Sequence, residues 1–179
     1  MKLLPVYLNC VMKSDVLLPG ADVSLDDRAY LRQLIGCMDV ADTHVFFYPR
    51  LLPVVRQQTQ SHKDLVTACC TMKLESGSLP VALRDSEERL SKGGIYLMET
   101  GLHLFLWVGA SVQQELLLNI FGTPSFSQID PNMLMVVKQE DRTELIFKHF
   151  LVEDKSASGG ASYVDFLCHM HKEIRQLLS

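Results

Sequence analysis

The stretch GIYLMETGLHLFLWV, residues 94–108, decides the fold. Two apolar runs, 94–98 and 102–108, flank Glu99-Thr100-Gly101, and a three-residue loop that ends in glycine is a common hairpin connection. Within 102–108 every residue except His103 is apolar, so both faces of this strand are apolar. Because such a strand has to be covered on both faces, we predict a sheet that lies between helices.

The residues around the hairpin predict an α/β (α+β) domain built on a mixed sheet with flanking helices. Ser24, Ser111 and Ser162 each stand three residues before an Asp or a Gln, the pattern of a helix-capping box. We therefore expect helices after these serines, and a further short helix at 143–151. Runs of β-branched, aromatic and aliphatic residues predict additional strands at 43–48, 79–83 and 133–138.

Composition and charge exclude several classes of protein. The chain has 179 residues, of which 47% are hydrophobic and 21% charged, values typical of a globular protein. The net charge of −4 argues against binding nucleic acid through its phosphates and provides no polybasic membrane patch. No signal peptide and no membrane-spanning stretch is expected. The five cysteines are irregularly spaced without a C-x-x-C pair, so a reducing, cytoplasmic environment is expected.

Cys168 and His171 form the most conspicuous candidate for a metal site. On a helix they are three residues apart and share a face. However, Met170 between them belongs to the apolar stripe of the predicted helix, and no second group of ligands completes a tetrahedral site. An ordinary amphipathic helix explains the pattern better.

The remaining chemically interesting residues have simpler explanations. Cys69-Cys70 is expected in a loop, and Trp107 is expected in the core. The acidic pairs and the glycine pairs are typical of solvated surfaces and turns: Asp26-Asp27, Glu87-Glu88, Gly93-Gly94 and Gly159-Gly160. No G-x-S-x-G, H-E-x-x-H, P-loop or G-x-G-x-x-G motif occurs. We therefore expect no catalytic, cofactor-binding or metal-binding residue in this chain.

Three groups of residues resemble one known family. They are 2–9, then 27–30 with 47–49, and then 151–155 with 162–167 and 171–172. In this order they resemble the C-terminal part of the cargo-adaptor subunit of the COPII inner coat, and are most similar to its vertebrate C/D-type paralogues. The stretch 94–109 also resembles the strand–turn–strand core of gelsolin repeats.

The resemblance implies a domain organisation. Residues 1–38 would be the end of a helical domain, since the sequence opens on apolar residues typical of a buried element. Residues 39–179 would form a gelsolin-like domain with a polar loop insertion at about 56–78. The zinc finger of the family lies in a part that this chain lacks, so no cofactor is expected.

The resemblance also implies a function. The family is non-enzymatic and acts through protein–protein contacts in cargo selection and transport from the endoplasmic reticulum to the Golgi. Its partners are a sister inner-coat subunit that stimulates a small GTPase, and the sorting signals of membrane cargo. The expected location is the cytoplasm, peripherally at endoplasmic reticulum exit sites and on COPII vesicles, with no nucleic-acid partner.

The chain departs from the family pattern in two places. The loop 56–70 is longer, and about thirty residues are missing between Asp130-Pro131 and Met133. In the family this stretch supplies a long helix that covers one face of the sheet. We therefore expect an exposed apolar patch on the sheet, or else a C-terminal helix, 162–178, that swings across to cover it.

Two other functions remain open at this stage. One is an actin- or calcium-binding gelsolin-type module, although Glu99 is the only acidic residue near the hairpin and calcium needs clustered oxygen ligands. The other is a small hydrolase that uses a Cys or a His, for which no motif exists.

Overall fold

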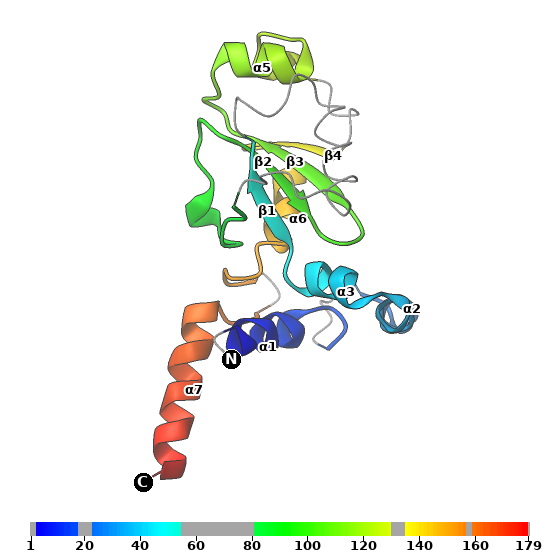
Figure 1. The fold of residues 1–179 in the computed structure, drawn as a ribbon, viewed down its shortest axis with the longest axis vertical. Helices are drawn as coiled ribbons and strands as arrows, with labels where there is room; N and C mark the ends of the chain where they lie inside the picture. Colours follow the sequence, from blue (N-terminus) through cyan, green and yellow to red (C-terminus); the bar gives the residue numbers. More distant parts are fainter. Residues whose placement is uncertain (1–2, 18–22, 55–80, 130–134, 157–158, 179) are drawn as a thin grey trace.

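The computed structural model describes residues 3–17, 23–54, 81–129, 135–156 and 159–178 (Figure 1). A four-stranded sheet lies in the upper half of the molecule with helices above and behind it, and a layer of further helices lies below it. None of the described helices is long and apolar enough to cross a lipid bilayer. The strands are β1 (Arg50–Pro53), β2 (Ile95–Glu99), β3 (Leu104–Val108) and β4 (Met135–Lys138), and the helices are α1 (Leu4–Lys13), α2 (Leu25–Cys37), α3 (Val40–Phe47), α5 (Gln114–Phe121), α6 (Thr143–His149) and α7 (Tyr163–Leu178).

The sheet is mixed, with the strand order β1-β2-β3-β4. The β1–β2 and β2–β3 pairs are antiparallel, and the β3–β4 pair is parallel. Leu97 lies opposite Leu106 in the central hairpin, and Leu106 lies opposite Val136 on its other side. The prediction of a mixed sheet with the 94–108 hairpin at its centre is therefore confirmed.

Both faces of the hairpin are covered, as its apolar residues on both faces predict. On one face Leu97 and Leu106 pack with Leu117 of α5. On the other face Phe105 and Trp107 pack with Phe147 of α6. Each fully buried side chain of this size contributes about 1.5–3 kcal/mol relative to exposure, so the two clusters are the main source of stability.

The hairpin turn also fixes the position of the helical layer. The amide of Thr100 donates to the carbonyl of His103 at 3.0 Å, and Gly101 has a φ of +81°. A Cβ at Gly101 would lie 3.3 Å from the carbonyl oxygen of Asp42 and the amide nitrogen of Phe46, both in α3. Glycine thus allows both the left-handed conformation and the close contact with α3.

Three of the predicted elements are wrong. Residues 43–48 are not a strand, because Asp39 caps a helix by accepting from the amide of Asp42 at 2.7 Å, and the strand follows later as β1. Of the predicted strand 79–83 the structure describes 81–83, and within these three residues only Leu83 pairs, through one bridge to Leu51. Ser111 does not cap α5, because its amide donates to the carbonyl of Lys92 and the helix begins three residues later.

The other helix predictions are confirmed. Ser24 and Asp27 form a capping box at α2, and the amide of Asp165 donates to the Ser162 hydroxyl at 3.2 Å where α7 begins. The first apolar residues form α1, with Pro5 in its first turn. The predicted helix at 143–151 corresponds to α6.

The expected apolar patch on the sheet is absent from the described residues. On the face that packs against α5, Leu97, Leu106 and Val136 are buried, and Ile129 and Phe121 pack with them. The alternative, in which the C-terminal helix crosses the sheet, is also wrong, since α7 contacts α1 and extends away from the sheet (Figure 1). The predicted loop at 56–78 and the predicted deletion between 131 and 133 lie outside the described residues.

A charge placed between the sheet and α5 should unfold the domain. We expect Leu106→Asp to lower the free energy of unfolding by about 3–5 kcal/mol, because an unpaired carboxylate would be buried among aliphatic side chains. Val81→Asp is the matched control, since Val81 is exposed. Chemical denaturation followed by circular dichroism measures both variants, and equal stabilities would show that Leu106 is not in the core.

Candidate functional site at the helix–sheet junction

The helix α1 turns a mixed polar and apolar face towards the body of the protein. Val6, Asn9 and Cys10 are buried, and Lys13 follows one turn later on the same face. Burial raises the pKa of the Cys10 thiol to about 12, which the positive charge of Lys13 opposes only in part. Cys10 is therefore a protonated, unreactive packing residue.

Lys13 attaches α1 to the turn that follows α6. Its ammonium group donates to the carbonyl of Val152 at 2.8 Å and also to that of Asp154. Desolvation lowers the pKa of Lys13, while the neighbouring Asp154 and Asp85 oppose this shift. The loop closes tightly around the lysine stem, because a Cβ on Gly160 would lie 3.0 Å from Cγ of Lys13.

Glu153 lies at the centre of the junction between the helical layer and the sheet. Its side chain is almost fully buried, and it accepts hydrogen bonds from three donors: the Tyr48 hydroxyl at 2.5 Å, Arg84 Nε at 2.9 Å and Arg84 Nη2. Its backbone carbonyl accepts from the amide of Tyr163 at 2.9 Å, at the start of α7. Burial and the hydrogen bond to Glu153 raise the pKa of Tyr48, so its hydroxyl remains a donor.

Asp85 is the second buried carboxyl group of the junction. It is fully buried, and its Oδ2 accepts from the amide of Val152 at 3.3 Å. Its Oδ1 is buried without a hydrogen-bond partner among the described residues. Desolvation raises the pKa of Asp85 well above its usual value, and the charges of Glu153 and Asp154 add to this effect.

Asp154 completes the junction on its exposed side. One of its carboxylate oxygens accepts from the Ser86 hydroxyl and the other from the amide of Glu87, both at 2.7 Å. The three consecutive residues 152–154 therefore bind α1, the segment 84–87, Tyr48 and the start of α7. This arrangement holds the helical layer and the sheet in one orientation, and the donors and acceptors named here bind one another, with the exception of Asp85 Oδ1.

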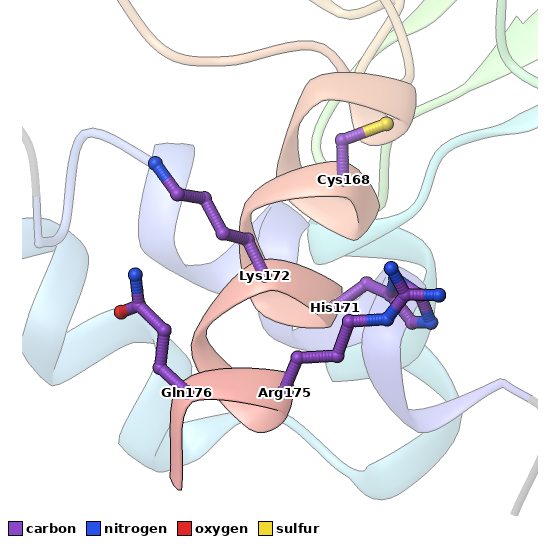
Figure 2. A pocket seen from close by; sticks show the side chains of 5 residues that line it. All are labelled: Cys168, His171, Lys172, Arg175 and Gln176. Carbon is purple, nitrogen blue, oxygen red and sulfur yellow. The ribbon is translucent and has the colours of Figure 1, made fainter. Parts of the chain in front are cut away.

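The pair Cys168 and His171, considered from the sequence as metal ligands, lies on the surface of α7. Cys168 and His171 are exposed on α7, and Figure 2 shows them with Lys172, Arg175 and Gln176, fanning out from one helix around a shallow hollow. Among the described residues no group of three or more His, Cys, Asp or Glu side chains could hold a metal ion. Cys69-Cys70 lies outside the described residues.

The other residues discussed from the sequence have structural roles. Trp107 is buried in the core, and its Nε1 donates to the Glu144 carboxylate at 3.1 Å. Asp27 belongs to the α2 capping box, and Glu87 pairs with Lys148 at 2.7 Å. Gly159 has a φ of +94°, which is consistent with a turn glycine.

Sequence reasoning did not identify the junction residues Lys13, Tyr48, Arg84 and Asp85. Tyr48 and Arg84 lie 105 and 69 residues from Glu153, and Lys13 lies 139 residues from Val152. No local spacing links such distant residues. The one available signal was the acidic pair Glu153-Asp154 directly after an apolar helix, which is also the pattern of an ordinary solvated turn.

Comparison with family models divides the chain into two matched parts. Residues 1–45 match the model described as the Sec23/Sec24 helical domain, and residues 77–146 match the model described as the gelsolin repeat. The first part contains α1, α2 and most of α3, and the second contains the β2–β3 hairpin and β4. The C-terminal helix α7 lies outside both matched parts.

Similar proteins match over the whole chain. The chain is 56% identical to human protein transport protein Sec24C and 44% identical to human Sec24D; each match covers 100% of this chain, but 18% and 19% of these relatives, respectively. It is also similar to a crystal structure of the human COPII-coat protein Sec24c, with a TM-score of 0.80 and 55% identity over 100% of this chain and 25% of that one. The chain thus spans about a fifth of its relatives' length.

The match to Sec24C also shows a length difference. It runs over 209 positions, whereas this chain has 179 residues, so at least 30 positions (209 minus 179) have no counterpart here. The number of unmatched positions agrees with the deletion of about thirty residues that the sequence predicts. Its predicted location, between 131 and 133, lies outside the described residues.

The pKa of Asp85 predicts how stability depends on pH. The pKa of Asp85 is higher in the folded state than in the unfolded state. Its contribution to stability is therefore fully present at pH values below the unfolded-state pKa, and it is lost as the pH rises through the folded-state pKa. Asp85→Asn removes the ionisable group and retains an acceptor for the amide of Val152. We expect the variant to equal or exceed the parent in melting temperature at pH 7–8, and this advantage to shrink towards pH 4. A variant that is less stable than the parent by the same amount at both pH values would contradict the burial of a protonated Asp85.

Proposed function

Because this chain is a homologue of the Sec24 protein transport proteins over all of its residues, we propose that it is a non-enzymatic component of the COPII vesicle coat. It takes part in cargo selection and in protein transport from the endoplasmic reticulum to the Golgi, through protein–protein contacts. The observation that carries this proposal is the 56% identity to Sec24C in a match that covers 100% of this chain.

The junction supports a structural role in a coat. A coat subunit must keep its domains in a fixed relative orientation while it is bound to its neighbours. Here Glu153, Lys13 and Asp154 fix the helical layer against the sheet through charge-assisted hydrogen bonds, the first two partly buried and the third exposed, which are about twice as strong as neutral ones. The interactions that the chain contributes are thus suited to holding a shape.

The homology to the Sec24 proteins is also the basis for the proposed partners and location. We propose that the chain acts with the GTPase-activating sister subunit of the inner coat and, as part of a longer protein, with the sorting signals of cargo. Its place is the cytoplasmic side of endoplasmic reticulum exit sites, where it associates with the membrane only through the coat. We assign no catalytic residue, cofactor or nucleic-acid partner to it.

The domain division is part of this proposal. We assign residues 1–38 to the end of a helical domain and residues 39–179 to a gelsolin-like domain with a loop insertion at about 56–78. The contact between α1 and α7 supports a close association of the two parts across this boundary.

An actin- or calcium-binding gelsolin module is the second candidate function. The match of residues 77–146 to the gelsolin repeat favours it, but this match concerns the fold alone. Near the hairpin Glu99 pairs with Arg50 at 3.4 Å, so its carboxylate already has a cationic partner. The coat function therefore has the stronger support.

Binding to purified coat proteins tests the proposal. We expect the immobilised chain to retain the purified sister inner-coat subunit at several times the level of a blank surface. The Val81→Asp chain should retain it equally, whereas the unfolded Leu106→Asp chain should not. A folded chain that binds no inner-coat subunit, but co-sediments with actin filaments or gains melting temperature on calcium addition, would favour the gelsolin-type function instead.

A further inference from the structure

The polar side of α7 carries a shallow hollow that is bordered by basic side chains (Figure 2). Its volume is about 380 Å³, and the side chains around it are all exposed and come from this one helix. Each of them lies three or four residues from another of the set, so they are neighbours on the helix surface. The hollow is lined by Cys168, His171, Lys172, Arg175 and Gln176.

The positive charge around the hollow is not neutralised within the described structure. Arg175 is four residues from His171 and three from Lys172, and like charges at these spacings repel one another. Among the described residues neither Lys172 nor Arg175 forms an ion pair, and no acidic residue lines the hollow. The acidic residues of α7, Asp165 and Glu173, are not three or four positions from either cation. An anion bound between the cations would relieve their repulsion.

The hollow lies on the opposite side of α7 from its apolar residues. With 3.6 residues per turn, Lys172 and Arg175 point about 140–160° away from the direction of Met170. Phe166, the buried residue of α7, belongs to the same side as Met170. A further part of a longer protein that packed against the apolar side would therefore leave the hollow open.

The charges favour a single anionic group over a membrane or a nucleic acid. Lys172 and Arg175 are equal in number to Asp165 and Glu173, whereas a helix that lies on anionic lipid carries an excess of cations. The net charge of −4 also disfavours an extended polyanion such as nucleic acid. A local cluster of cations on an acidic protein is suited to one anionic side chain of a partner.

A phosphorylated side chain matches the donors around the hollow better than a carboxylate does. A phosphate group on serine or threonine carries a charge of about −1.5 to −2 near neutral pH and offers three acceptor oxygens. The Arg175 guanidinium can donate two parallel hydrogen bonds to such a group, and the Lys172 ammonium adds a third donor and a second charge. A carboxylate has one charge and two oxygens, so it would leave part of this capacity unused.

We propose that the hollow on α7 binds the phosphate group of a phosphorylated serine or threonine in a partner protein. Arg175 holds the phosphate through two hydrogen bonds, Lys172 provides the second positive charge, and His171 adds a ring N–H donor. This inference rests on the surface of α7 alone and goes beyond the proposed coat function.

Fluorescence anisotropy of a short labelled phosphoserine peptide, titrated with the full chain at low ionic strength, tests this proposal. We expect saturable binding with a dissociation constant of about 0.1–1 mM, and no binding of the same peptide with unmodified serine. Lys172→Gln combined with Arg175→Gln should raise the dissociation constant at least ~10-fold, because the charge-assisted hydrogen bonds are lost. Since both residues are exposed, the fold should survive, and circular dichroism checks this.

Arg89→Gln combined with Lys92→Gln is the matched control, because it removes the same charge at the same spacing from exposed positions outside α7 and should leave binding unchanged. Equal binding of the phosphorylated and unmodified peptides, or a double variant at Lys172 and Arg175 that binds like the parent, would overturn the proposal. Vesicles containing phosphatidylinositol 4-phosphate provide the second arm. A parent that binds these vesicles but not the phosphoserine peptide would also overturn it, and would assign the hollow to a lipid headgroup.

Discussion

A buried carboxylate has to be paired, and the arrangement of this molecule depends on how Glu153 is paired. Leaving such a charge unpaired costs several kcal/mol, so its three donors from Tyr48 and Arg84 are fixed in place once the chain is folded. Tyr48 follows α3 and stands two residues before β1, and the carbonyl of Glu153 accepts from the first amide of α7. One residue, through its side chain and its backbone carbonyl, thus orients the helices relative to the sheet.

The sheet and the junction stabilise the protein in different ways. The hairpin is held by apolar side chains on both faces, an interaction that tolerates exchanges between apolar side chains of similar volume but not the burial of a polar one. The junction is held by directional bonds, including those of Lys13 to the carbonyls of Val152 and Asp154. The first kind of interaction makes the domain stable, and the second defines one orientation between its parts.

The sequence predicts the sheet better than the junction. The central hairpin depends on residues that are neighbours in the sequence, whereas the junction depends on residues that are far apart in it. The apolar residues on both faces of 102–108 identify the central hairpin, and the capping patterns at Ser24 and Ser162 locate two helices. Strand propensity failed at 43–48, where the Asp39 cap and the contact of α3 with Gly101 favour a helix. The junction combines residues that are up to 139 positions apart, so only the folded chain brings them together.

Native-state hydrogen exchange of α1 tests most directly whether Glu153 unites the helices and the sheet. We predict that α1 amides in the parent open only with a free energy close to that of the sheet. In Glu153→Gln this opening free energy should fall by about 2 kcal/mol, while Glu88→Gln, at an exposed position, leaves it unchanged. An α1 that exchanges equally in the parent and in Glu153→Gln would contradict the account, because it would show that the helix is held independently of the junction.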